Sequence, residues 1–168
     1  VEHRDIDVSR TVGWFVIMHP FPTSFESGKS LSDNLHTVRE LLADVPGNGE
    51  SYGLLRYLNA DRDVRHSITQ HANADIRLNY LGRLETDFGE QSDFQLAPES
   101  SGNHQSAGSV RPHLIEIDVR IRGGRLLMEW TYSGNCHRKE TIEGLAKQCL
   151  QVVRELSLEE TRPRGDVR

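Results

Sequence analysis

The sequence has little cysteine, no long apolar run and no excess of positive charge. Cys136 and Cys149 are the only cysteines among 168 residues, and they lack CxxC spacing, so a reduced, cytoplasmic setting is expected. No apolar run approaches the ~18 residues that a membrane-spanning helix requires. The net charge of −5 gives no general attraction to nucleic acid or to an anionic membrane. The N-terminus has no signal-peptide pattern, and because it starts at Val1 we expect an excised or processed segment.

Several motifs that identify enzymes are also missing. The chain has no GxSxG elbow, no GxxxxGK[ST] phosphate loop and no GxGxxG at the start of a helix. Of the eight histidines, His66 and His71 are five positions apart, which does not place two metal ligands on one helix face. No metal site is predicted. Composition and spacing alone therefore leave the function open.

The residues that are present predict a folded, mixed α/β chain, with 36% apolar content. The run Thr11–His19 favours β structure and has apolar side chains on both faces, which predicts a buried strand. Apolar residues at helical spacing predict a helix from Ser30, where Ser30 and Asp33 resemble a capping box; Pro46-Gly47 ends it. A glycine-rich turn and a short helix over 53–58 follow.

The second half predicts strands and a closing helix. Residues 74–82 alternate well enough for a strand that ends at Gly82, whereas 85–112 show no apolar period. Isoleucine and valine alternate with charged residues over 115–121, and a Gly-Gly turn leads to a return strand over 126–132. A helix over 138–156 follows, with Cys149 on its apolar stripe as a core thiol, and then a polar tail. The order predicts a mixed sheet with flanking helices and sheet faces that need partners beyond this chain.

Three segments, in order, resemble motifs of the epimerization domains of nonribosomal peptide synthetases. "RTVGWFVIMHP" at Arg10–Pro20 looks like the family's Arg-Thr-Val-Gly-Trp-Phe segment. "PGNGESYG" at Pro46–Gly53 is similar to PxxGxGYG, with Ser51 in place of a glycine. "LNYLG" at Leu78–Gly82 resembles FNYLG, with Leu78 in place of phenylalanine. The closing "LLMEWTYSGNCHRKETIEGLA" resembles the family's last strand and helix, so the resemblance covers essentially the whole chain.

The resemblance also implies what this sequence leaves out. Peptide-bond-forming condensation domains usually have a VGxFVNT-like stretch where this chain has Val12–Val16, and they lack the NYLG signature. The family's HHxxxDG motif, whose second histidine is the expected acid/base, is absent here, and the EGHGR glutamate motif is expected just before Val1. The chain thus resembles the later part of the C-terminal lobe, over 1–157, of a chloramphenicol-acetyltransferase-like two-lobed fold. A polar tail or linker is expected over 158–168.

For the function, the resemblance implies conversion of an L- to a D-aminoacyl or peptidyl thioester. The substrate would arrive on the 4′-phosphopantetheine arm of a peptidyl carrier protein, and this chain itself is expected to bind no cofactor. The expected partners are that carrier protein and the N-terminal lobe of the same domain, without nucleic acid or membrane. Alone, the chain is expected to be inactive. The alternatives are a non-catalytic module that docks a carrier protein and a peptide-bond-forming condensation domain.

By carry-over from the family motif, Tyr80 and Asn79 are the candidate site residues. A phenol and an amide near a strand end can donate hydrogen bonds to the oxygen of a developing enolate. Because strand side chains alternate, both reach one tunnel only if the strand is bulged or lies at an edge. The alternative for Tyr80 is a strand aromatic whose hydroxyl binds a neighbour.

The other motif residues are assigned structural roles. Trp14 and Phe15 are expected in the core, and Arg10 either meets a carboxylate or lies on the surface. Gly13 is expected to allow close approach of another backbone. The remaining members shape the turn and the strand end: Pro46, Gly49, Tyr52, Gly53 and Gly82.

Overall fold

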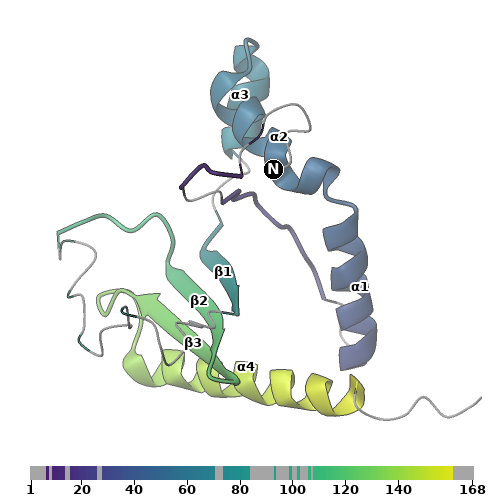
Figure 1. Ribbon diagram of the computed structural model, residues 1–168, viewed down its shortest axis with the longest axis vertical. Coiled ribbons are helices and arrows are strands. Elements are labelled where there is room, and N and C mark those ends of the chain that lie inside the picture. The colour runs from purple at the N-terminus through teal and green to yellow at the C-terminus, as the bar shows by residue number, and fades with distance from the viewer. Residues whose placement is uncertain are drawn as a thin grey trace, which may run out of the picture. The chain divides into compact units, whose positions relative to one another are not determined.

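The computed structural model describes residues 7, 9–13, 16–25, 28–70, 74–83, 93, 99, 102, 106 and 108–160. The chain divides into two compact units, residues 1–73 with 150–168, and residues 74–149. The elements in chain order (Figure 1) are α1 (Leu31–Ala43), the 3-10 turn η1 (Pro46–Gly49), α2 (Glu50–Gly53), the π-helical turn η2 (Leu54–Leu58), α3 (Arg62–Gln70), β1 (Ile76–Arg83), β2 (Ile115–Arg122), β3 (Arg125–Tyr132) and α4 (Lys139–Glu160).

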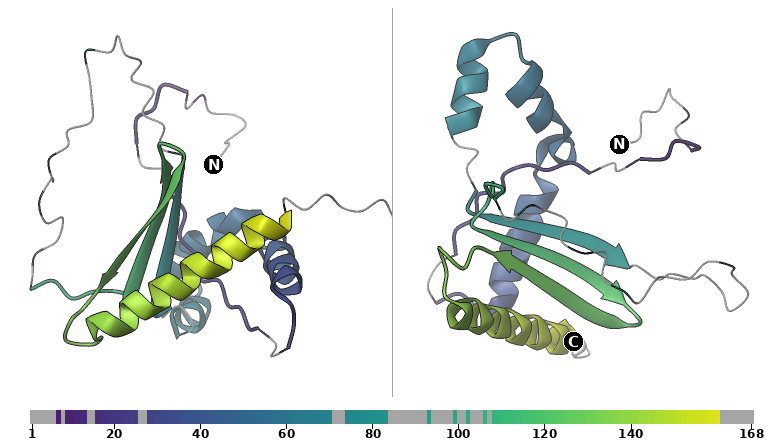
Figure 2. Two further views of the ribbon diagram at one scale, coloured as in Figure 1. Left: turned by 90° about the horizontal axis from the view of Figure 1, so that it is seen from below. Right: turned by 90° about the vertical axis from the view of Figure 1, so that its left-hand side faces the viewer.

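The second unit contains a three-stranded mixed sheet in the order β1-β2-β3. Figure 2 shows the three strands side by side. β2 and β3 form the predicted antiparallel hairpin, which runs in register from Ile115 opposite Tyr132 to Arg122 opposite Arg125. β1 pairs with β2 in parallel, and the predicted mixed sheet is confirmed.

The core lies on one face of this sheet. Alternation puts Ile115, Ile117 and Val119 on the same side of β2, where each is 8% exposed and clusters with Ile142 of α4. The aromatic and methionine side chains of β3 that pack against this cluster are Met128, Trp130 and Tyr132. The alternating pattern that predicted the hairpin therefore also selects the buried face.

The part of this apolar face that belongs to β1 stays exposed. Ile76, Leu78 and Tyr80 are register partners of the three buried β2 residues, so their side chains share that face. They are nevertheless 54%, 67% and 61% exposed. Within the described residues, the core thus covers β2 and β3 but not β1.

Helix α1 begins where the capping residues predicted. Ser30 is the N-cap; its Oγ accepts a hydrogen bond from the Asp33 backbone N–H, and the Asp33 carboxylate reaches back to the Ser30 backbone N–H. The hydrogen bonds from Ser30 lower the pKa of Asp33 below its ordinary value. The ionised carboxylate of Asp33 is therefore the form that completes the capping box.

The predicted strand over Thr11–His19 is wrong. The described residues of this run form no regular structure, and Val12 and Met18 are 100% and 61% exposed. A β-favouring composition measures how well side chains fit between neighbouring strands, so it cannot create a strand without a partner. Trp14 and Phe15 lie outside the described residues, and their predicted core packing stays a prediction.

Two helices also differ from the prediction. Sequence reading missed α3, because charged and polar residues fill most of Arg62–Gln70 and its apolar stripe is narrow. The closing helix α4 runs to Glu160, beyond the predicted end at Leu156. The start of the expected polar tail is therefore helical, and residues 161–168 lie outside the described part.

Candidate functional site

Asn79 and Tyr80 lie on the edge strand β1, on opposite faces. In the parallel register Asn79 is the partner of Asp118 and Tyr80 is the partner of Val119. The register shifts between Tyr80 and Arg83, which marks a bulge or irregularity after both candidate residues. β1 is an edge strand and has the expected irregularity. Because the irregularity follows both Asn79 and Tyr80, however, their side chains stay on opposite faces of the strand.

Asn79 is held in a polar network on the face opposite the core. Its Nδ2 donates a hydrogen bond of 2.9 Å to Oδ1 of Asp118. Nη2 of Arg77 donates to Oδ2 of Asp118 at 3.1 Å and to Oε2 of Glu116 at 3.2 Å. The amide keeps one N–H and its carbonyl oxygen for other partners. Asp118 therefore fixes the orientation of the candidate amide, and Arg77 balances the two carboxylates.

The network predicts a stability effect for Arg77→Leu. Glu116 is buried, its side chain being 9% exposed, and the side chains of Arg77 and Asp118 are each 25% exposed. Without the guanidinium, two carboxylates lie on one face of β2 with no cationic partner, which costs about 2–3 kcal/mol in the free energy of unfolding. Urea denaturation measures it.

The matched control for this substitution is Arg120→Leu on β2, the strand that carries Glu116 and Asp118. Arg120 pairs with Glu129 at 3.2 Å, but that glutamate side chain is 63% exposed. An exposed pair contributes about 0–1 kcal/mol. Equal losses in the free energy of unfolding of the two variants would show that the Arg77 network stabilises the fold no more than an exposed ion pair does.

Tyr80 presents its phenol away from this network. The side chain is 61% exposed, and its hydroxyl has no hydrogen-bond partner among the described residues. Two residues further, Gly82 adopts a φ of +72°, a backbone conformation that other residues rarely adopt, at the position where the register shifts. The alternative reading, in which the hydroxyl binds a neighbour, finds no such neighbour in the described part of the chain.

The glycine-rich motif forms a left-handed turn in the first unit. Gly47, Asn48 and Gly49 have φ values of +54°, +52° and +84°. Gly49 is buried, and a Cβ at this position would lie 2.7 Å from Cγ of His19 and nearer still to its Cδ2. The predicted glycine turn is confirmed, and its third residue is a glycine because an imidazole ring occupies the space of a side chain.

This contact brings two of the three motif segments together. A pocket of about 390 Å³ is lined by His19, Pro20, Val45, Pro46, Gly49, Ser51, Tyr52, Leu55, Ser67 and Ile68. Tyr52 is half-buried here, and its hydroxyl accepts a hydrogen bond of 3.0 Å from Nη1 of Arg56. The sequence placed these segments in one family pattern but gave no signal that His19 packs on Gly49.

Three motif residues have a different setting. Gly53 has helical φ and ψ of −62° and −40°, with open space where a Cβ would stand, so it does not shape the turn as predicted. Arg10 and Gly13 are exposed in irregular backbone. For Arg10 this position is on the surface, one of the two expected outcomes.

The sequence profile of the condensation domain family matches residues 2–167. The chain belongs to the condensation domain family. Its relatives include a linear gramicidin synthase protein of Brevibacillus parabrevis, 37% identical over 89% of this chain and 2% of the relative. Chondramide synthase cmdD of Chondromyces crocatus is 35% identical over 90% of this chain and 4% of that protein. This condensation-family chain thus spans only a few per cent of the length of the curated relatives it matches.

A solved structure supports the same placement. The epimerization domain from the third module of tyrocidine synthetase B superposes with a TM-score of 0.77 at 28% identity, over 93% of this chain and 35% of that one. The expected fold class, a mixed α/β portion of a chloramphenicol-acetyltransferase-like fold, is confirmed for this condensation-family chain. Among the described helices, none is both long and apolar enough to cross a membrane. No cluster of metal-binding side chains occurs within the same residues.

Proposed function

We propose that this chain is the later part of the C-terminal lobe of an epimerization domain in a nonribosomal peptide synthetase. The domain would convert an L-aminoacyl or peptidyl thioester to its D form while the substrate is attached to the phosphopantetheine arm of a carrier protein in the cytoplasm. The observation that carries the proposal is the likeness to the tyrocidine epimerization domain over 93% of the chain. The Asn79-Tyr80 pair on an exposed edge strand agrees with it.

The chemistry needs a base, an acid and a hydrogen-bond donor to oxygen. A base removes the proton from the α-carbon, the electron pair moves onto the thioester oxygen, and an acid returns a proton to the opposite face of the same carbon. Donors aimed at that oxygen stabilise the enolate. Tyr80 supplies a hydroxyl that has no partner in the described part of the chain. Asn79 is the second candidate donor; Asp118 orients its amide, which lies on the opposite face of β1, so one tunnel receives either the phenol or the amide. The histidine and glutamate of the family motifs would come from residues outside this chain.

One competing function has an observation in its favour. The matching family profile is that of condensation domains, which fits peptide-bond formation as well as epimerization. The two reactions make different products from a loaded carrier protein, because only epimerization leaves the number of peptide bonds unchanged. A module that only docks a carrier protein would make neither product.

The decisive experiment uses the domain that joins this chain to its preceding lobe. Incubated with a carrier protein loaded with an L-aminoacyl thioester, it is expected to give a mixture of D and L products after thioester cleavage and chiral chromatography. This chain alone is expected to leave the L form unchanged. Peptide formation with a second loaded carrier, without any D product, would assign condensation instead.

A further inference from the structure

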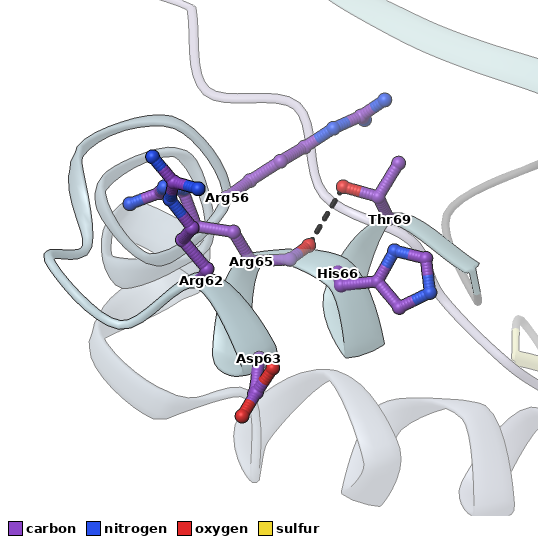
Figure 3. A pocket seen from close by; sticks show the side chains of 6 residues that line it. All are labelled: Arg56, Arg62, Asp63, Arg65, His66 and Thr69. Carbon is purple, nitrogen blue, oxygen red and sulfur yellow. Dashed lines mark hydrogen bonds between the residues drawn. The ribbon is translucent and has the colours of Figure 1, made fainter.

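A basic pocket lies on the segment from η2 to α3 and shares no residue with the candidate site of the proposed reaction. It is an open surface hollow of about 520 Å³, lined by Arg56, Arg62, Asp63, Arg65, His66 and Thr69 (Figure 3). With neutral histidine, three guanidiniums and one carboxylate give the pocket a net charge of +2, whereas the whole chain carries −5. None of the three arginines forms an ion pair with a carboxylate in the described part of the chain.

Two of these guanidiniums are held in place by neighbouring groups. Arg56 donates to the Tyr52 hydroxyl at 3.0 Å and lies over the rings of Tyr52 and Tyr57, at 5.8 and 5.1 Å from their centroids. Nη1 of Arg65 donates to the backbone carbonyl of Asn59. Side chains that are already ordered lose less conformational entropy when a ligand binds. The pocket therefore offers positioned positive charge.

Two other polar side chains of the pocket, Thr69 and His66, are already engaged. The Thr69 hydroxyl donates to the Arg65 carbonyl at 2.7 Å, the dashed line in Figure 3. The Nε2 atom of His66 lies 2.7 Å from Nε2 of Gln70. Free hydrogen-bonding capacity thus consists mainly of guanidinium N–H groups, which donate and cannot accept, beside the single carboxylate of Asp63. Such groups bind tetrahedral oxyanions in a bidentate manner.

We propose that this pocket binds a phosphate ester. Its volume lies within the range of ligand pockets, about 300–1,000 Å³, and exceeds what a bare ion fills. Two sources share this chemistry: the phosphate of a phosphopantetheine arm, an assignment that rests on the proposed function, and free phosphorylated metabolites. In both cases Arg62, the exposed guanidinium without a protein partner among the described residues, binds the phosphate directly.

The test measures binding by calorimetry to the domain that contains this chain. The probes are 4′-phosphopantetheine, pantetheine and inorganic phosphate, at low and at physiological ionic strength. Arg62→Gln is expected to weaken binding of both phosphate-containing probes about fivefold, and Asp63→Asn to strengthen it by up to the same factor. Arg122→Gln, which removes an exposed arginine from β2, is the matched control and is expected to leave affinity unchanged. Added salt should weaken binding in the wild-type protein.

Each outcome decides the proposal. Phosphopantetheine binding more tightly than phosphate, with pantetheine not binding, supports the pocket and the carrier arm as its source. Equal affinity for phosphopantetheine and phosphate supports the pocket and a free phosphate as its source. Failure of both phosphate probes to bind, or equal weakening by Arg62→Gln and Arg122→Gln, overturns it. Because binding is measured without turnover, a domain that binds phosphate through Arg62 but makes no D product overturns only the proposed function.

Discussion

Gly49→Ala is expected to destabilise the first unit by about 3 kcal/mol. Two costs combine at this position. The backbone has a φ of +84°, which a residue with a Cβ adopts at a cost of about 1–2 kcal/mol. The new methyl group also overlaps the ring of His19, which must move away from its place over the turn. The free energy of unfolding in urea, measured by circular dichroism, gives the loss.

Three further variants separate these two costs. Gly47→Ala has a φ of +54° but open space for the methyl group, so it shows the backbone cost alone, about 1 kcal/mol. Gly53→Ala has helical backbone and open space, so it should stabilise the chain by up to about 1 kcal/mol. His19→Ala should remove part of the loss caused by Gly49→Ala in the double variant. If Gly49→Ala costs no more than Gly47→Ala, the imidazole does not define this turn.

Patterns within a short stretch of sequence predicted their elements well. The alternation over 115–121 and the Gly-Gly turn predicted the hairpin and its buried face, because adjacent strands need only a local turn. Ser30 and Asp33 predicted the start of α1 for the same reason, since the capping box closes within four residues. A short sequence pattern was therefore sufficient to predict an element whose interacting residues are also close in the sequence.

Features that depend on distant partners were not predicted. The parallel pairing of β1 with β2 joins Asn79 to Asp118 across 39 positions, and nothing in either segment identifies the other. The run Thr11–His19 shows the opposite error, because its composition predicted a strand for which the described chain has no partner. The candidate site shows the same difference between what a short motif identifies and what depends on distant partners. The motif named Asn79 and Tyr80, but only the fold shows that Asp118 holds the first and that no described residue holds the second.

Tyr80→Phe is expected to lower the rate of epimerization by the complete domain about 100-fold. Loss of one hydrogen-bond donor to a developing oxyanion typically costs a factor of about 100–1,000 in rate. The substitution removes only the hydroxyl and leaves the ring in place. The rate of D-product formation on a loaded carrier protein measures the effect, and Tyr57→Phe, another exposed tyrosine at 67%, is the matched control.

The stability of the same variant tests the structural alternative. If the Tyr80 hydroxyl were bound to a neighbour, Tyr80→Phe would lower the free energy of unfolding by about 1 kcal/mol. Because the hydroxyl has no partner among the described residues and the side chain is 61% exposed, unchanged stability is expected together with the loss of rate. A wild-type rate in Tyr80→Phe would remove this residue from the site.

Exchange of the α-proton in D₂O then distinguishes the role of Tyr80 from that of a proton-transfer residue. A donor to the enolate oxygen serves both directions, so Tyr80→Phe should slow deuterium uptake equally from L- and D-substrate. A residue that delivers or removes the proton on one face would slow uptake mainly from one enantiomer. Because the Asn79 amide lies on the opposite face of β1 from the phenol, Asn79→Ala should slow exchange much less than Tyr80→Phe. Asp118→Asn should slow exchange no more than Asn79→Ala, because Asp118 orients that amide. Equal exchange in Asn79→Ala and wild type would leave Tyr80 as the oxygen donor that β1 contributes.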